Sequence, residues 1–169
     1  FNVYQELTGL PNGLYEVGLQ GFCRQGWADV AAANYEAGTE DIQAYVYGMS
    51  GGMTKKTPFK SIFDGRDSES HYTENVTDVS HLINPWGPTD SEITINGETC
   101  YVPNGMAGFA IWEEMGDNRY QATAQVFVAD GTLRIGAACD DWRDGGFWTI
   151  FDSFTLKYVS DQMGDIVKE

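Results

Sequence analysis

The segment YQATAQVFVADGTLRIGAACDDWRDGGFWTIFDSFTLKYV, residues 120–159, decides the fold class of this 169-residue chain. Apolar and polar residues alternate in three parts of it, Tyr120–Val128, Leu133–Ala138 and Phe147–Val159. This two-residue period is typical of half-buried β-strands, and the Asp-Gly pair at 130–131 is a turn signal between the first two of them. We therefore predict three consecutive strands that form a meander.

The amino-terminal part of the chain repeats the same pattern. Phe1–Leu7 alternates, a Pro-Asn-Gly turn follows, and Leu14–Cys23 alternates again. In the second of these strands Tyr15 and Val17 share one face, so we expect an antiparallel pair with one face in the core. Ile42–Tyr47 is predicted to be a further strand.

A hairpin and a helix are predicted in the middle of the chain. Asn96 and Gly97 separate two short apolar strands and supply both positive-φ residues of a type I′ turn. Asn104 is expected to cap a helix from Gly105 to Met115. Residues 24–41 and 48–91 show no sustained period, and the longer stretch is interpreted as a binding loop or a mobile insertion.

These segments together predict an all-β fold: an antiparallel two-sheet β-sandwich, a jelly roll of about eight strands, with one short helix. No alternation of strands with crossover helices is present in the sequence. Residues 1–169 are interpreted as a single domain, and because the first residue is Phe1, we expect it to be a piece of a longer protein.

The charge of the chain excludes several partners. Ten Lys and Arg residues against 25 Asp and Glu residues give a formal charge of -15. Such a surface repels nucleic acid and anionic lipid, and no apolar run reaches the length of a transmembrane helix, so neither nucleic acid nor membrane insertion is expected. Neutral glycans and divalent cations are compatible with this charge, although solubility alone also accounts for it.

The three cysteines do not decide the redox compartment. Cys23 and Cys139 each lie near the end of a predicted strand, which allows a bridge between them, whereas Cys100 is left over. Buried free thiols are the favoured interpretation, because no CxxC pair or Cys/His cluster is present.

Two groups of motifs resemble galactose-binding-like jelly rolls of the carbohydrate-binding-module type. They are Gly9–Val17, with its turn followed by Gly-Leu-Tyr, and the closing W-x-x-x-D-x-F-x-L pattern from Trp148 to Leu156. Tyr101–Met106 is similar to versions found in surface or secreted proteins of gut Bacteroidetes, whereas residues 48–92 fall outside the resemblance. The resemblance implies that the protein is secreted or lies on the outer cell surface, and is therefore extracellular. It also implies two partners: a poly- or oligosaccharide, and the rest of a larger surface protein.

The resemblance also implies a structural calcium ion. Modules of this kind hold Ca²⁺ with an aspartate at the position of Asp152 and with acidic residues of the first strand, and that first-strand pair has no counterpart here. The alternative is that Asp152 hydrogen-bonds backbone amides.

The ligand site is predicted at the loop end that carries Trp142, Arg143 and Asp141, joined by Trp27 and Arg24. An indole in a polar, glycine-flanked loop can stack on the C–H face of a sugar while charged groups bond its hydroxyls. The alternative for each indole is a ring folded over the rim of the sandwich. Trp112 and Trp148 are assigned to the core.

No motif in the sequence indicates catalysis. The two histidines, His71 and His81, accompany no nucleophile elbow, so the chain is predicted not to be an enzyme. Two functions remain: a non-catalytic carbohydrate-binding module, or a structural and adhesive β-domain that packs within a larger surface protein. An exposed aromatic cleft would favour the first, and a broad apolar patch would favour the second.

Overall fold

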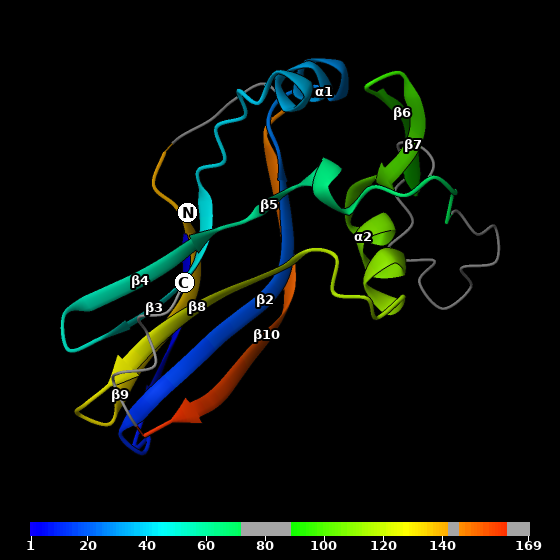
Figure 1. The fold of residues 1–169 in the computed structure, drawn as a ribbon. Helices are drawn as coiled ribbons and strands as arrows, with labels where there is room; N and C mark the ends of the chain where they lie inside the picture. The colour runs from blue at the N-terminus through cyan, green and yellow to red at the C-terminus, as the bar shows by residue number, and fades with distance from the viewer. Residues whose placement is uncertain (72–88, 142–145, 162–169) are drawn as a thin grey trace.

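The computed structural model describes residues 1–71, 89–141 and 146–161, and it is mostly β, with 54% strand and 17% helix (Figure 1). The strands are β1 (Asn2–Thr8), β2 (Gly13–Arg24), β3 (Ala44–Ser50), β4 (Met53–Pro58), β5 (Lys60–Ser61), β6 (Asp90–Ile95), β7 (Glu98–Pro103), β8 (Gln121–Val128), β9 (Thr132–Cys139) and β10 (Trp148–Ser160). The helices are α1 (Ala28–Ala37), the 3₁₀ turn η1 (Ile62–Gly65) and α2 (Gly105–Glu114). Neither α-helix is long and apolar enough to span a membrane.

The long strands form two sheets. The first sheet has the order β1-β9-β3-β4, and all its neighbours are antiparallel. In the second sheet β2 pairs antiparallel with β10 and with β8. β5 also pairs with β2, in parallel, over only two residues, so the prediction of a wholly antiparallel fold is wrong at this point.

The predicted strands are present, but three predicted pairings are wrong: β1 with β2, β8 with β9 and β9 with β10. β1 pairs with β9 instead of β2, and the three strands from β8 to β10 do not form a meander, because β9 belongs to the other sheet. The turn between β1 and β2 and the turn between β8 and β9 each carry the chain from one sheet to the other. The two turns meet where the Leu10 N–H donates to the Gly131 carbonyl at 3.1 Å. Turn residues show that the chain reverses, but they do not specify the sheet that the next strand joins.

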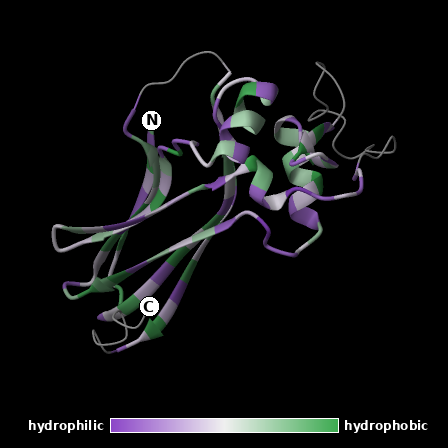
Figure 2. Cartoon of the chain, turned by 45° about the horizontal axis from the view of Figure 1, so that its top comes forward, coloured by the Kyte–Doolittle hydropathy of each residue, from purple (hydrophilic) through white to green (hydrophobic). Residues whose placement is uncertain are grey.

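Both sheets contribute side chains to one hydrophobic core, the first core. Val17 of β2 and Val126 of β8 come from the second sheet, and Val46 of β3 and Ala137 of β9 come from the first. Each of these four side chains is fully buried. Hydrophobic and hydrophilic residues alternate along these strands (Figure 2), as expected for sheets with one face in a core.

A second core lies against the other face of β2, near that strand's carboxyl end. Phe22 points into it, and Phe63 of η1, Trp112 of α2 and Tyr120 complete it. The Phe22 ring lies 5.0 Å from the Tyr120 ring and 5.5 Å from the Phe109 ring. The carboxyl-terminal half of β2 is therefore buried on both faces, and the helices and the β6–β7 hairpin gather beside it (Figure 1).

The prediction of a single helix is wrong, because α1 occupies the region between residues 24 and 41. Only Ala31 and Ala32 of this helix are buried, and its N-cap residue Trp27 makes no side-chain capping bond. A helix with so little apolar surface lacks the 3.6-residue pattern by which a helix is recognised. The predicted helix α2 is confirmed, but the Asn104 side chain at its N-cap makes no capping hydrogen bond.

The β6–β7 hairpin is confirmed, with φ of 51° at Asn96 and 82° at Gly97. The irregular interpretation of residues 48–91 is wrong for its first part, where β4, β5 and η1 lie. β4 was missed because almost all of its residues are exposed and polar, so it shows no apolar alternation. η1 begins with a capping box formed by Ser61 and Asp64.

Candidate functional site

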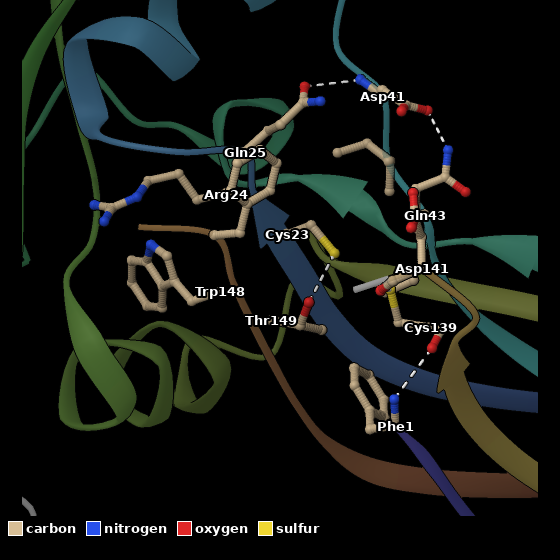
Figure 3. Close-up of a pocket in the computed structure, with 13 residues that line it drawn as sticks. Phe1, Cys23, Arg24, Gln25, Asp41, Gln43, Cys139, Asp141, Trp148 and Thr149 are labelled. Atoms are coloured by element: carbon tan, nitrogen blue, oxygen red, sulfur yellow. Dashed lines mark hydrogen bonds between the residues drawn. The ribbon is translucent and has the colours of Figure 1, made fainter. Parts of the chain in front are cut away.

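A pocket of about 420 Å³ lies where strands of both sheets end (Figure 3). β2 ends at this point and β10 begins there, since Arg24 and Trp148 are partners in the ladder. Ala44 at the start of β3 pairs with Cys139 at the end of β9, which brings the first sheet to the same place. The antiparallel pairing thus collects four strand ends, and the loops that follow them, around one hollow.

The lining of the pocket combines polar, aromatic and thiol side chains. Its members are Phe1, Cys23, Arg24, Gln25, Asp41, Ile42, Gln43, Ala44, Cys139, Asp141, Phe147, Trp148 and Thr149. The segment before β3 is fixed to the end of β2 because the Asp41 N–H donates to Gln25 Oε1 at 2.7 Å. The Gln43 amide in turn donates to Asp41 Oδ1. Amide and carboxylate groups therefore stand together along one wall.

Arg24 and Trp148 line the pocket where β2 ends and β10 begins, and Figure 3 shows their side chains directed away from Asp41 and Gln43. The guanidinium of Arg24 lies 4.5 Å from the centre of the Trp148 ring, a cation–π contact, and partial burial lowers the Arg24 pKa. Arg24 Nε and Trp148 Nε1 are buried donors without a hydrogen-bond partner in the described part of the chain. A second, shallow hollow of about 300 Å³ lies along these two residues and is lined further by Asn104, Gly105, Gly146 and Phe147.

Two of the five residues predicted to bind a ligand meet in the pocket: Arg24 and Asp141 both line it. Trp27 does not line it; this indole is 66% exposed at the amino end of α1 and lies against Gly146. Trp142 and Arg143 lie outside the described residues. The flanking residues Asp141 and Gly146 line the pocket and the shallow hollow, respectively.

No sequence motif marks Gln25, Asp41 and Gln43 as site residues, because they are isolated polar residues in a loop. Trp148, which was assigned to the core, packs against the second core through Phe22 at 5.6 Å but also lines the pocket. A signal for Asp41 and Gln43 was available, since they flank Ile42 at the beginning of a predicted strand. Trp112 is buried, as expected.

Asp152, the predicted calcium ligand, lies in β10 at a bulge. Ser153 has φ of 55°, and its N–H donates to Asp152 Oδ1 at 2.7 Å. This contact is the backbone hydrogen bond of the alternative interpretation. In the part of the chain that the structure describes, no three His, Cys, Asp or Glu residues are grouped to hold a metal ion. The calcium site therefore stays a prediction.

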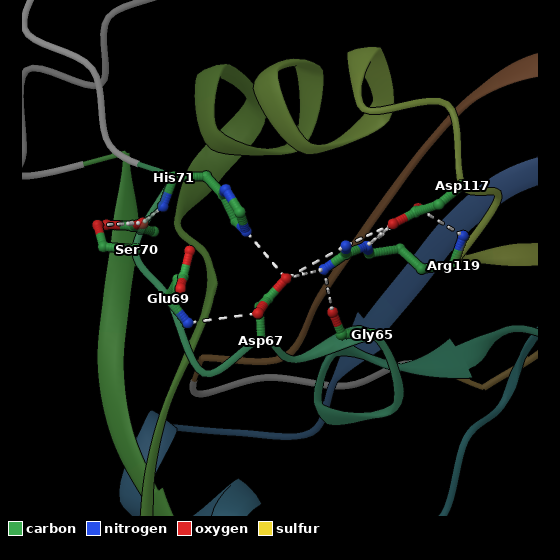
Figure 4. A network of polar contacts seen from close by, with 8 residues as sticks. Gly65, Asp67, Glu69, Ser70, His71, Asp117 and Arg119 are labelled. Carbon is green, nitrogen blue, oxygen red and sulfur yellow. Dashed lines mark hydrogen bonds and ion pairs between the residues drawn. The ribbon is translucent and has the colours of Figure 1, made fainter.

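A separate polar network joins the segment after η1 to the segment before β8 (Figure 4). Asp67 accepts hydrogen bonds from Arg119 at 3.3 Å and lies 3.0 Å from His71 Nε2. The hydrogen bond with His71, supported by those from the Glu69 N–H and Arg119, lowers the Asp67 pKa to about 2. Trp112 packs against both the His71 ring and the Arg119 guanidinium. We interpret this network as a structural tie within the second core region.

All three cysteines are free, and Cys23 and Cys100 are buried, as the favoured interpretation expects; Cys139 differs from it because its thiol is only partly buried. No protein-family model, no curated protein and no solved structure matches the chain. The function must therefore be argued from the pocket itself.

Proposed function

We propose that this chain is a non-catalytic carbohydrate-binding module of a secreted or cell-surface protein, and that its glycan lies in the pocket between Arg24 and Asp141. The observation that carries this proposal is the lining of that pocket, where carboxylate, amide and guanidinium groups stand beside aromatic rings. A sugar presents hydroxyl groups at its edge and C–H groups on its faces, so it needs both kinds of contact.

The polar wall suits a neutral polyhydroxylated ligand. Asp41 and Asp141 offer acceptors, and Gln43 offers an acceptor and a donor. Arg24 offers charge-assisted donors to the part of a glycan that extends into the shallow hollow beside the pocket. Since the chain carries a formal charge of -15, the field around the pocket favours a neutral glycan over an anionic one.

We further propose that the two sheets are the layers of a jelly-roll β-sandwich. Support comes from the way consecutive strands change sheet, from β8 to β9 and from β9 to β10. The shared first core, with side chains from β2, β3, β8 and β9, supports the same arrangement.

The binding test compares the unmodified chain with Asp141→Ala on a glycan array, followed by titration calorimetry with the best oligosaccharide. Loss of a charged hydrogen-bond acceptor costs about 1.5–3 kcal/mol, so we expect roughly 10- to 100-fold weaker binding. Glu114→Ala removes another exposed carboxylate, at the end of α2 and outside the pocket, and is expected to change nothing. Equal affinities for both variants, or no glycan bound at millimolar concentration, would overturn the proposal.

Release of reducing sugar by the unmodified chain would overturn the non-catalytic part of the proposal. Asp41 and Asp141 would then be the pair to examine, because glycoside hydrolysis uses two carboxyl groups.

The second candidate function is a structural or adhesive domain within a larger surface protein, and β1 favours it. This strand is at the edge of the first sheet, and Phe1, Val3 and Tyr4 on or beside it are each at least half exposed. An exposed apolar edge is a surface that another part of a protein can cover. Val3→Glu would abolish such packing in the parent protein but would leave glycan binding unchanged, which separates the two functions.

A further inference from the structure

We infer that Cys23 and Cys139 are an oxidisable thiol pair, which a low-molecular-weight disulfide converts into a disulfide bond that links the two sheets at the mouth of the pocket. This inference does not depend on the nature of the ligand.

The two sulfurs come from different sheets but enter the same space. Cys23 lies on the face of β2 that carries Val17, and it belongs to the first core. Cys139 is the last residue of β9, in the other sheet, and packs against the same core. Both line the pocket, and Figure 3 shows both side chains directed into it.

Ala44 shows how closely the sheets approach at this point. Its backbone N–H faces the Cys23 sulfur, and it is also the ladder partner of Cys139. The Cys139 backbone directs its N–H and C=O to Phe1 on the other side, at 2.9 and 3.1 Å. Ala44 and Cys139 are therefore a non-hydrogen-bonded pair, whose Cα atoms lie about 4.5 Å apart and whose side chains are close. Both cysteines are thus immediate neighbours of one residue.

The two thiols differ in access, which sets the order of reaction. Cys139 is partly exposed, and its Sγ donates to the Asp141 carbonyl at 3.3 Å. Cys23 is buried, its sulfur lies 3.2 Å from Thr149 Oγ1, and burial raises its pKa to about 11. A reagent from solution therefore meets Cys139 first.

The reaction has two exchange steps. The Cys139 thiolate attacks one sulfur of the external disulfide RSSR, which forms a mixed disulfide and releases RS⁻. The Cys23 thiolate then attacks the Cys139 sulfur, which forms the Cys23–Cys139 bond and releases a second RS⁻. The protons lost by the two cysteines convert both leaving groups to RSH, so two thiols are oxidised and one external disulfide is reduced.

Cys100 is an internal control. It is 6% exposed in β7, belongs to the second core and does not line the pocket. Its thiol is expected to stay reduced under the same conditions.

The test incubates the folded chain with oxidised glutathione, blocks the remaining thiols by alkylation after acid quenching, and maps the peptides by mass spectrometry. We expect the three thiols to fall to one, a mass loss of two hydrogens, and a crosslinked peptide that joins residues 23 and 139. The oxidised chain should also melt at a higher temperature, because the bond closes a long loop. Cys100→Ser should form the same bond, whereas Cys139→Ser should form none.

Three results would overturn the inference: three alkylated cysteines, a bond that includes Cys100, or a glutathione adduct on Cys139 that does not proceed to the disulfide. We also expect the attack of Cys23 on the mixed disulfide to become faster between pH 7 and pH 10, because more of the Cys23 thiol is then ionised.

Discussion

The two cores of this protein differ in how their sequences encode them. The first core is built from long strands with regular alternation, such as β8 and β9. The second core is assembled from short pieces, namely η1, the β6–β7 hairpin, α1 and α2, which lack a common period. β2 serves both, with Val17 in the first core and Phe22 in the second. Regular alternation thus identifies a strand, but it does not show that the strand's other face is also covered.

The substitution Phe22→Ala is expected to have the largest effect, and it tests whether β2 couples the two cores. This ring is fully buried, and it contacts Phe109, Tyr120 and Trp148. Removal of a buried phenylalanine costs about 3–5 kcal/mol. Because β2 is shared, we expect both cores to unfold in one transition, displaced to lower urea concentration.

The measurement is urea unfolding followed by intrinsic fluorescence and by far-ultraviolet circular dichroism. Two separate transitions, with the sheet signal unchanged from the unmodified chain, would show that the second core is an independent unit.

The network around Asp67 predicts an acid sensitivity of the second core region. The Asp67 pKa is about 2 in the folded state, below its ordinary value of 3.8, so the carboxylate form stabilises the fold above pH 4. This contribution is lost as the pH falls from about 4 through 2. Asp67→Asn should reduce the free energy of unfolding at pH 6 by about 1–3 kcal/mol, because His71 and Arg119 lose a charged acceptor. The melting temperature of the variant at pH 6 should therefore be lower.

The check is the melting temperature between pH 2 and pH 6. The difference between Asp67→Asn and the unmodified chain should shrink toward the acid end, and a constant difference would contradict the assigned role. Glu69→Gln, which leaves the neighbouring backbone bond to Asp67 in place, is the control.

A smaller effect is expected at the turn of the β6–β7 hairpin. Gly97 has φ of 82°, a conformation that costs a residue with a Cβ about 1 kcal/mol, and no atom lies close enough to obstruct the methyl group. Gly97→Ala should therefore reduce stability by about 1 kcal/mol through backbone strain alone. Chemical denaturation of Gly97→Ala measures this, and an unchanged midpoint would mean that the hairpin contributes little to the second core.

The smallest expected effect concerns calcium near Asp152. We expect the melting temperature to be slightly higher with millimolar Ca²⁺ than with a chelator, and Asp152→Asn to remove that difference. The hydrogen bond from the Ser153 N–H survives in the asparagine variant, which isolates the metal from the bulge. Equal melting temperatures after complete metal removal would remove calcium from the account.

Most of the strands could be predicted from the sequence because they carry their own local period, which β4 and β5 lack, and the hairpin because Asn96 and Gly97 favour positive φ. The pairing of β1 with β9 could not, because it joins residues more than a hundred positions apart and no local signal specifies it. Helix α1 was missed because its buried surface consists of two alanines.

Part of the candidate site could also be predicted from the sequence, because some of its residues follow strands with a clear local pattern. Arg24 and Asp141 follow recognisable strands, so their place at a strand end could be inferred. Asp41 and Gln43 reach the pocket only because β3 lies next to β9, which is again a long-range pairing. Trp148 packs against the second core, as its sequence context predicts, and it also lines the pocket, which the strand pattern does not reveal.

The most direct test of the proposed binding site is nuclear magnetic resonance of the ¹⁵N-labelled chain, titrated with the oligosaccharide that binds best on the array. We predict that the largest shift changes fall on Arg24, Gln43, Thr149 and the Trp148 indole, all of which line the pocket. Saturable changes confined to β1, at the exposed edge of the first sheet, would show that the glycan binds outside the pocket and would contradict the account.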